Sequence, residues 1–171
     1  MKCIRIVSCL AVILAVAAAQ AAEGEVPKLQ KEQEWLQQLV GEWENEGEAV
    51  MEPGKPLVKT KGTESSRMLG DLALFEQKGE FMGAPFNGLL TVGYDIEKKK
   101  YVGTWIDTMQ NKMWTYEGSV DATGKILTLE TEGQQEGKLL KFKDSVEIKD
   151  KDHKVYSTQI ESDGKWLTIM T

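Results

Sequence analysis

The sequence predicts an all-β protein, an antiparallel up-and-down β-barrel of about ten strands with one N-terminal helix. Segments typical of strands recur about every ten residues from Trp43 onward, and turn residues separate them. No separation is long enough for a crossover helix, so consecutive strands are expected to pair as antiparallel neighbours. Closure into a barrel would remove the two raw edges of an open sheet. A β-sandwich is the competing architecture.

The first 21 residues have the pattern of a secretory signal peptide. Basic residues precede an apolar run from Ile6 to Ala19, which is too short for a comfortable membrane span. Ala19-Gln20-Ala21 matches a cleavage pattern. We expect an exported protein, periplasmic or secreted, in which 22–171 form a single domain without a membrane span. An uncleaved anchor is the alternative.

Charge and cysteine content narrow the class of partner. Cys3 and Cys9 both lie in the predicted signal, so the mature chain is expected to have no disulfide. The mature chain has 19 lysine and arginine residues and 27 aspartate and glutamate residues, which gives a net charge of −8. An acidic surface repels phosphate backbones, which argues against nucleic acid as a partner. The sequence does not indicate an oligomeric state.

One helix is expected, from Pro27 to Val40. Proline suits a first-turn position, a ragged apolar stripe follows, and Gly41 is a natural stop. Strands are expected at 43–51, 57–67, 72–79, 87–94, 101–109, 112–120, 125–132, 138–148, 154–162 and 165–170. Proline, glycine, asparagine and aspartate between them favour turns, because they fix or tolerate the required backbone angles.

The central hairpins indicate which face is interior. If Gln110-Asn111 is a two-residue loop, Trp105 lies opposite Tyr116. The turn before it would pair Tyr94 with Tyr101. One face then carries Leu90, Val92, Tyr94, Tyr101, Trp105, Asp107, Met109, Trp114 and Tyr116. We expect this aromatic face to be interior, because aromatic pairs across strands add about 0.5–1 kcal/mol each.

The same face supplies candidate ligand-binding residues. Aromatic walls with a few polar groups are typical of a pocket for a small apolar guest. The candidates are Trp105, Asp107, Trp114, Tyr116, Tyr94 and Arg67. Asp107 or Arg67 would orient the polar end of the guest. The alternative is structural, with rings that fill the barrel, Asp107 in water at a strand end, and Arg67 paired with Glu64 on the surface.

Several motifs along the chain resemble a known family. They are Leu36-x-x-Leu39-Val40-Gly41-Glu42-Trp43, Met51-Glu52-Pro53-Gly54-Lys55-Pro56, Lys61-Gly62-Thr63-Glu64, Gly88-Leu89-Leu90-Thr91, Gly93-Tyr94-Asp95, Tyr101-Val102-Gly103-Thr104-Trp105-Ile106-Asp107 and Tyr116-Glu117-Gly118. In this order they are similar to the bacterial domain of unknown function 1579 (DUF1579) family. The resemblance spans nearly the whole mature chain and implies a calycin-like barrel, as in lipocalins and fatty-acid-binding proteins. It implies no established activity and no catalytic residues.

Gly41-Glu42-Trp43 also resembles the G-x-W signature of calycins. That resemblance implies that Trp43 plugs the barrel base under a cation from a late strand. No arginine lies near the C-terminus, which departs from the calycin pattern, and Lys165 is the candidate substitute.

The residues that enzymes and metal sites commonly need are scarce. The sole histidine, His153, is expected in a solvated turn, and no nucleophile and base, metal site or cofactor is predicted. The leading hypothesis is therefore a binder of a small apolar or amphipathic ligand. The alternative is an interaction or structural protein of the cell envelope with a filled barrel. An enzyme is the third hypothesis.

Overall fold

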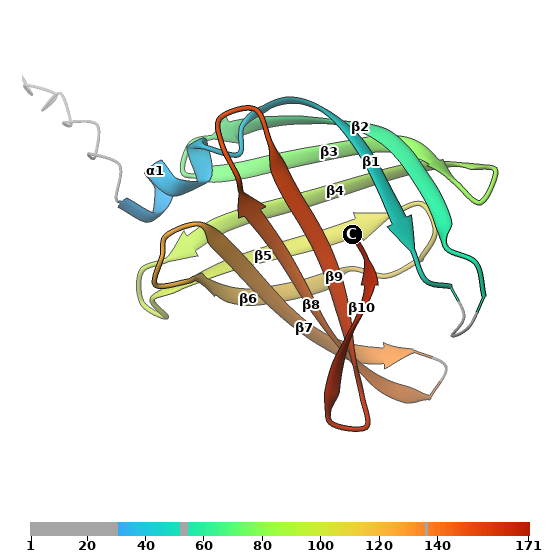
Figure 1. Cartoon of the computed structure of the whole chain (residues 1–171). Coiled ribbons are helices and arrows are strands. Elements are labelled where there is room, and N and C mark those ends of the chain that lie inside the picture. Colours follow the sequence, from blue (N-terminus) through green and yellow to red (C-terminus); the bar gives the residue numbers. More distant parts are fainter. Residues whose placement is uncertain (1–30, 52–54, 136) are drawn as a thin grey trace, which may run out of the picture.

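A closed ten-stranded barrel dominates the computed structural model, which describes residues 31–51, 55–135 and 137–171. Strands that follow one another in sequence are antiparallel neighbours, and β10 returns to β1 (Figure 1). The predicted all-β barrel is confirmed, and the sandwich is excluded. The predicted signal segment, both cysteines and residues 27–30 of the predicted helix lie outside the described residues.

The elements follow the predicted order closely. They are α1 (Lys31–Gln37), β1 (Gly41–Ala49), β2 (Val58–Leu69), β3 (Leu72–Phe81), β4 (Ala84–Asp95), β5 (Lys100–Asp107), β6 (Trp114–Val120), β7 (Ile126–Gln135), β8 (Lys138–Ile148), β9 (Lys154–Ser162) and β10 (Lys165–Met170). Local turn chemistry explains the agreement. At the β9–β10 hairpin, Asp163 and Gly164 have φ of 51° and 74°, and such positive values suit a two-residue turn that matches strand twist.

Helix α1 lies across one end of the barrel (Figure 1). It inserts Trp35 and Leu36 into the core, and Leu39 follows from the connection to β1. The Trp35 indole N–H donates to the Gly124 carbonyl at 2.7 Å, and the Tyr101 hydroxyl donates to the Glu32 carbonyl at 3.0 Å. Apolar contact, a hydrogen bond to the β6–β7 connection and a hydrogen bond from β5 therefore close this end.

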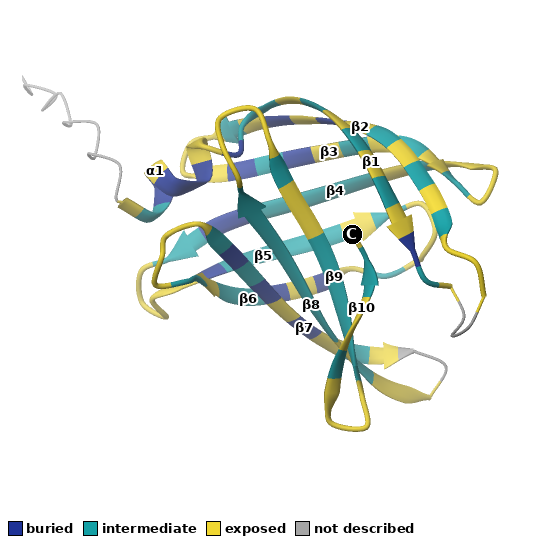
Figure 2. Cartoon of the chain, viewed as in Figure 1, coloured by how far each residue is buried: buried dark blue, intermediate teal, exposed yellow. Residues whose placement is uncertain are grey.

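The two ends of the barrel differ in how tightly they are filled. Most buried residues gather toward the α1 end, whereas the strands toward the other end are mainly intermediate or exposed, apart from buried Ala49 and Trp114 (Figure 2). The core cluster at the α1 end includes Ala73, Phe75 and Val92, each at most 4% exposed. This packing leaves room for a cavity in the other part of the barrel.

The β5–β6 hairpin differs from its expected register. Trp105 lies opposite Trp114 rather than Tyr116, whose partner is Gly103. The prediction of a two-residue loop was wrong, because β5 ends at Asp107 and β6 begins only at Trp114. A shift of two residues leaves every side chain on its expected face, since strand side chains alternate with a period of two. The expected pair of Tyr94 with Tyr101 is confirmed.

The barrel closes through a short seam. Strand β1 pairs with β2 at every position from Gly41 to Ala49, yet among the described residues its register with β10 consists of Ala49 with Met170. Near this pair, the Glu48 amide donates to the Thr171 carbonyl at 2.7 Å, and the Thr171 amide donates to the Glu48 carbonyl at 3.0 Å. The seam is therefore the least extensively paired junction between neighbouring strands.

Candidate functional site

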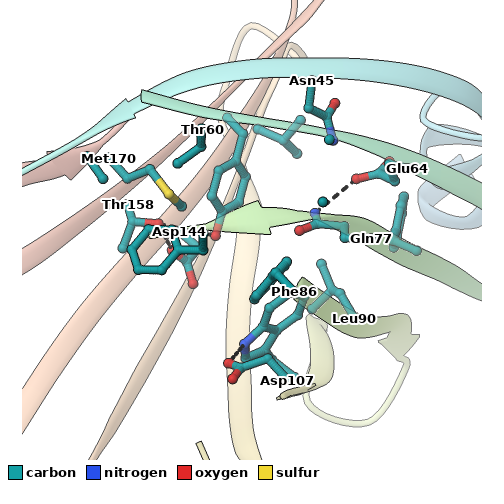
Figure 3. Close-up of a pocket in the computed structure, with 18 of the residues that line it drawn as sticks. Asn45, Thr60, Glu64, Gln77, Phe86, Leu90, Asp107, Asp144, Thr158 and Met170 are labelled. Atoms are coloured by element: carbon teal, nitrogen blue, oxygen red, sulfur yellow. Dashed lines mark hydrogen bonds between the residues drawn. The ribbon is translucent and has the colours of Figure 1, made fainter. Parts of the chain in front are cut away.

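A cavity of about 620 Å³ lies within the barrel, and its lining extends to Val50, Met51, Met109 and Gln110 in the connections opposite α1. Its walls are largely apolar, and Figure 3 shows part of the lining. The apolar and aromatic residues that line it are Leu39, Ala49, Val50, Met51, Phe75, Phe81, Phe86, Leu90, Val92, Trp105, Met109, Trp114, Tyr116, Leu127, Leu129, Phe142, Val146, Tyr156, Ile169 and Met170. The interior is hollow, although aromatic side chains line it as expected.

Trp105 is one of the four predicted site residues that line the cavity. Its indole stacks on Phe86, with ring centroids 6.1 Å apart and planes at 27°. The indole N–H donates to the Asp107 carboxylate at 2.7 Å (Figure 3). Two strands, β4 and β5, thus hold a large flat ring in a defined orientation against the cavity.

Asp107 also lines the cavity, at the end of β5. One carboxylate oxygen accepts from the Trp105 indole, and the other accepts from the backbone amides of Met109 and Gln110 at 2.7 and 2.9 Å. The carboxylate therefore holds the turn that lengthens the β5–β6 connection. This network explains why a carboxylate occurs on the aromatic face.

Trp114 and Tyr116 complete the predicted aromatic wall on β6. They are 4% and 8% exposed, and both line the cavity. The Trp114 ring meets Phe142 edge to face at 5.4 Å, while the Lys112 ammonium lies 3.5 Å from the Trp114 ring centroid. These contacts hold the indole firmly in the barrel wall.

The structure places the other two predicted residues away from the cavity. Tyr94 is partly buried and packs edge to face at 5.2 Å on Tyr101, which belongs to the core cluster near α1. Arg67 lies on the outer surface, with its guanidinium 3.9 Å from Glu76 and not paired with Glu64 as the structural alternative expected. The β2 alternation explains this position, because Glu64 and Ser66 are buried while Arg67 is exposed.

A buried ion pair that the sequence did not predict spans the cavity wall. The Lys154 ammonium on β9 lies 2.5 Å from the Glu64 carboxylate on β2, and the two side chains are 12% and 8% exposed. The Gln77 amide donates to the other Glu64 oxygen at 3.1 Å (Figure 3). Burial lowers the pKa of Lys154, and the attraction of Glu64 opposes this shift.

Lys154 also supplies the cation that the calycin resemblance implied for Trp43. Its ammonium lies 4.3 Å from the Trp43 ring centroid. The assignment of Lys165 to this position was wrong, because Lys165 is exposed at the start of β10. Trp43, Lys154 and Glu64 together join β1, β9 and β2, away from the short backbone seam.

A second polar group in the cavity centres on Asp144 of β8. The Thr158 hydroxyl donates to its carboxylate at 2.7 Å and lies 3.2 Å from the Tyr156 hydroxyl. Burial raises the pKa of Asp144, while hydrogen bonding to Thr158, Tyr116 and Tyr156 opposes the rise. Burial and the nearby Asp144 charge raise the pKa of Tyr116 and of Tyr156, so both phenols stay protonated.

Strand alternation was the signal that could have located these polar residues. Asp144 alternates with Phe142 and Val146, which both face the cavity. Glu64 similarly alternates with buried Ser66. A charged residue in register with inward neighbours is a candidate for the interior, and the sequence interpretation applied this test only to Asp107.

Exposed apolar side chains surround the open end of the barrel. They lie in or beside the connections opposite α1, namely Met51, Leu57, Met82, Met109, Met113 and Leu139. Each of them is at least 46% exposed. The entrance to the cavity therefore carries an apolar rim.

His153, the sole histidine, is 74% exposed and lies 2.8 Å from Asp150 in the β8–β9 connection. The described ranges contain no group of three or more histidine, cysteine, aspartate or glutamate residues placed to hold a metal ion. Within the same ranges, no helix has the length and apolar character needed to cross a membrane.

Comparison with known proteins identifies the family. No curated protein matches the chain. The family model described as "Protein of unknown function (DUF1579)" matches residues 28–171, which comprise every described strand and α1. This match agrees with the motifs of the sequence and with the calycin-like barrel they imply. The chain belongs to the DUF1579 family.

Proposed function

We propose that this protein is an exported binder of a small apolar or amphipathic molecule, which it holds inside the barrel. The cavity of about 620 Å³ is the observation that carries the proposal. Sites for small molecules commonly have about 300–1,000 Å³ and are mostly apolar with a few placed polar groups. The alternative, an envelope interaction protein with a filled barrel, does not account for this volume.

The cavity's two kinds of lining suit an amphipathic guest. Trp105, Phe86 and Leu90 offer apolar surface on β4 and β5, while the Asp144 and Glu64 groups offer hydrogen-bonding partners. The apolar rim would let a poorly soluble molecule reach the entrance without crossing a charged surface. Export follows from the predicted signal segment, 1–21.

Native mass spectrometry of protein purified from its own source tests the proposal directly. A retained small molecule is the expected result. Calorimetric titration of the recombinant protein with decanol provides an independent measurement, and saturable binding is expected. The absence of both a retained molecule and decanol binding would contradict the proposed function. Cell fractionation with mass determination of the chain tests export. We expect a chain cleaved near residue 21 in an extracytoplasmic fraction.

A pair of variants on β2 tests whether binding occurs in the cavity. Thr60 lines the cavity, whereas Lys59 is exposed on the opposite face of the strand. We expect Thr60→Trp to weaken decanol binding, because its indole would occupy cavity volume. Lys59→Trp adds the same ring outside and should bind like the parent protein. Equal effects of the two substitutions would place the bound decanol elsewhere.

A further inference from the structure

Asp144 is a carboxylate in the cavity wall without a cationic partner. Among the ion pairs formed by the described residues, none includes Asp144, whereas Glu64 is matched by Lys154. Figure 3 shows the Asp144 carboxylate beside Thr158. Asp107 also lines the cavity and is likewise absent from those ion pairs, but its two oxygens already accept from the Trp105 indole and from two backbone amides. Asp144 therefore differs from Glu64 in having no lysine partner among the described residues, and from Asp107 in having no backbone donor among its hydrogen-bond partners.

The groups around Asp144 are hydroxyls and aromatic rings. Thr158, Tyr116 and Tyr156 all form hydrogen bonds with its carboxylate. An ionised carboxylate has about four acceptor positions, so capacity for a further donor remains. Tyr116 and Tyr156 also line the cavity and offer ring faces, which attract cations.

Burial makes the ionised form of Asp144 costly, as the direction of its pKa shift indicates. A cation brought into the cavity would reduce this cost and gain a charge-assisted hydrogen bond. An anionic head group would instead be repelled by Asp144. Lys154 does not offset that repulsion, because its charge is already matched by Glu64 at 2.5 Å. Lys61 and Lys78 also line the cavity, but both residues are exposed to solvent on β2 and β3.

We propose that the molecule held in the barrel is a cationic amphiphile. Its ammonium group pairs with Asp144, and its apolar part contacts the surface formed by Trp105, Phe86 and Leu90. This inference rests on the proposed function and specifies its ligand class. Asp144 lies on β8, and β4 and β5 are four and three strands away around the barrel. A guest that spans the cavity from β8 to β4 and β5 would place its charged end at Asp144 and its apolar end on Trp105.

The test compares three probes with the same ten-carbon chain: decylamine, decanol and decanoate. Calorimetric titration of the intact protein near neutral pH measures all three. Decylamine is expected to bind about tenfold or more tightly than decanol, as a charge-assisted hydrogen bond implies, and decanoate is expected to bind most weakly. Asp144→Asn keeps the shape of the side chain and should bring decylamine to the affinity of decanol.

Glu147→Gln is the matched control. Glu147 lies three residues along the same strand, outside the cavity lining, and pairs with Lys149 at 2.6 Å. This variant should retain the full preference for decylamine.

The outcomes separate the two proposals. If decanol binds and decylamine binds no more tightly, the cationic class is wrong while the proposed function stands. If none of the three probes binds and no molecule is retained from the source, both fail. The ranking of probes by the parent protein decides the question even if Asp144→Asn does not fold.

Discussion

The Lys154 ammonium lies 2.5 Å from the Glu64 carboxylate, although ninety residues separate them in sequence. The pair connects β9 with β2 on either side of the barrel seam. Lys154 also lies against the Trp43 ring. One lysine therefore neutralises an interior carboxylate and links strands on both sides of the seam, at a level away from the short pairing of Ala49 with Met170.

Loss of the Lys154 charge should destabilise the fold strongly. Lys154→Met leaves Glu64 as an uncompensated buried charge, which typically costs about 3–5 kcal/mol. Urea denaturation measures the change. Lys154→Met combined with Glu64→Leu should recover much of the loss, because no unpaired charge remains. The control Lys61→Met breaks the exposed pair with Glu46 and should cost less than about 1 kcal/mol. Similar losses of free energy of unfolding in Lys154→Met and Lys61→Met would contradict this account.

Two glycines should differ in their tolerance of a methyl group. A Cβ at Gly118 would overlap the Thr128 carbonyl oxygen on β7, whereas a Cβ at Gly88 would overlap the outer ring atoms of Trp105. Backbone in a strand ladder cannot move as readily as a side chain. We expect Gly118→Ala to cost about 1–3 kcal/mol and Gly88→Ala to cost less. Gly88→Ala should also change the near-ultraviolet circular dichroism by displacing the Trp105 indole. The reverse order of stability, measured in urea, would refute the argument.

Asp144 should make stability depend on pH in the opposite sense to most carboxyl groups. Burial raises the pKa of Asp144 above its usual 3.8, so the folded state binds this proton more tightly than the unfolded chain. The contribution of this bound proton to the free energy of unfolding is fully present below pH 3.8. It is lost as pH rises through the raised pKa of Asp144. Tyr116 and Tyr156, which face Asp144, remain protonated over this range.

Asp144→Asn removes this titration. The variant should be more stable than the parent protein near neutral pH, and the difference should shrink as pH falls toward 3.8. Other carboxyl groups titrate in both proteins and cancel in the comparison. Thermal denaturation across this range checks the prediction. A difference that grows on acidification would show that Asp144 is stabilised as an anion.

The seam should be where the barrel opens first. The Val50 amide donates to the Ile169 carbonyl at 2.7 Å beside the two bonds between Glu48 and Thr171, and local opening breaks such short pairings at low free-energy cost. Native-state hydrogen exchange should be faster at the Val50 and Thr171 amides than at Leu74, within the long β3–β4 pairing. A bound guest should slow exchange at the seam if it contacts Ala49 and Met170, which line the cavity. Equal protection at the seam and at Leu74 would contradict this prediction.

Much of the architecture could be predicted because its determinants are local. Turn residues such as Asp163 and Gly164 adopt the positive φ values that a short hairpin needs. Alternation along β5 and β6 indicated the interior face, on which Trp105, Trp114 and Tyr116 line the cavity. The β5–β6 loop was misjudged because the Asp107 carboxylate binds turn amides and ends the ladder early.

Alternation, turn chemistry and ordered motifs along the chain were sufficient to predict the all-β class, the strand order, the aromatic interior and the family. The hollow interior, the contact of Lys154 with Glu64 and the position of Asp144 in the cavity lining with Tyr156 became evident only from the folded barrel. Cavity volume depends on how all ten strands and α1 pack together. Contacts between residues far apart in sequence exist only once the barrel has closed.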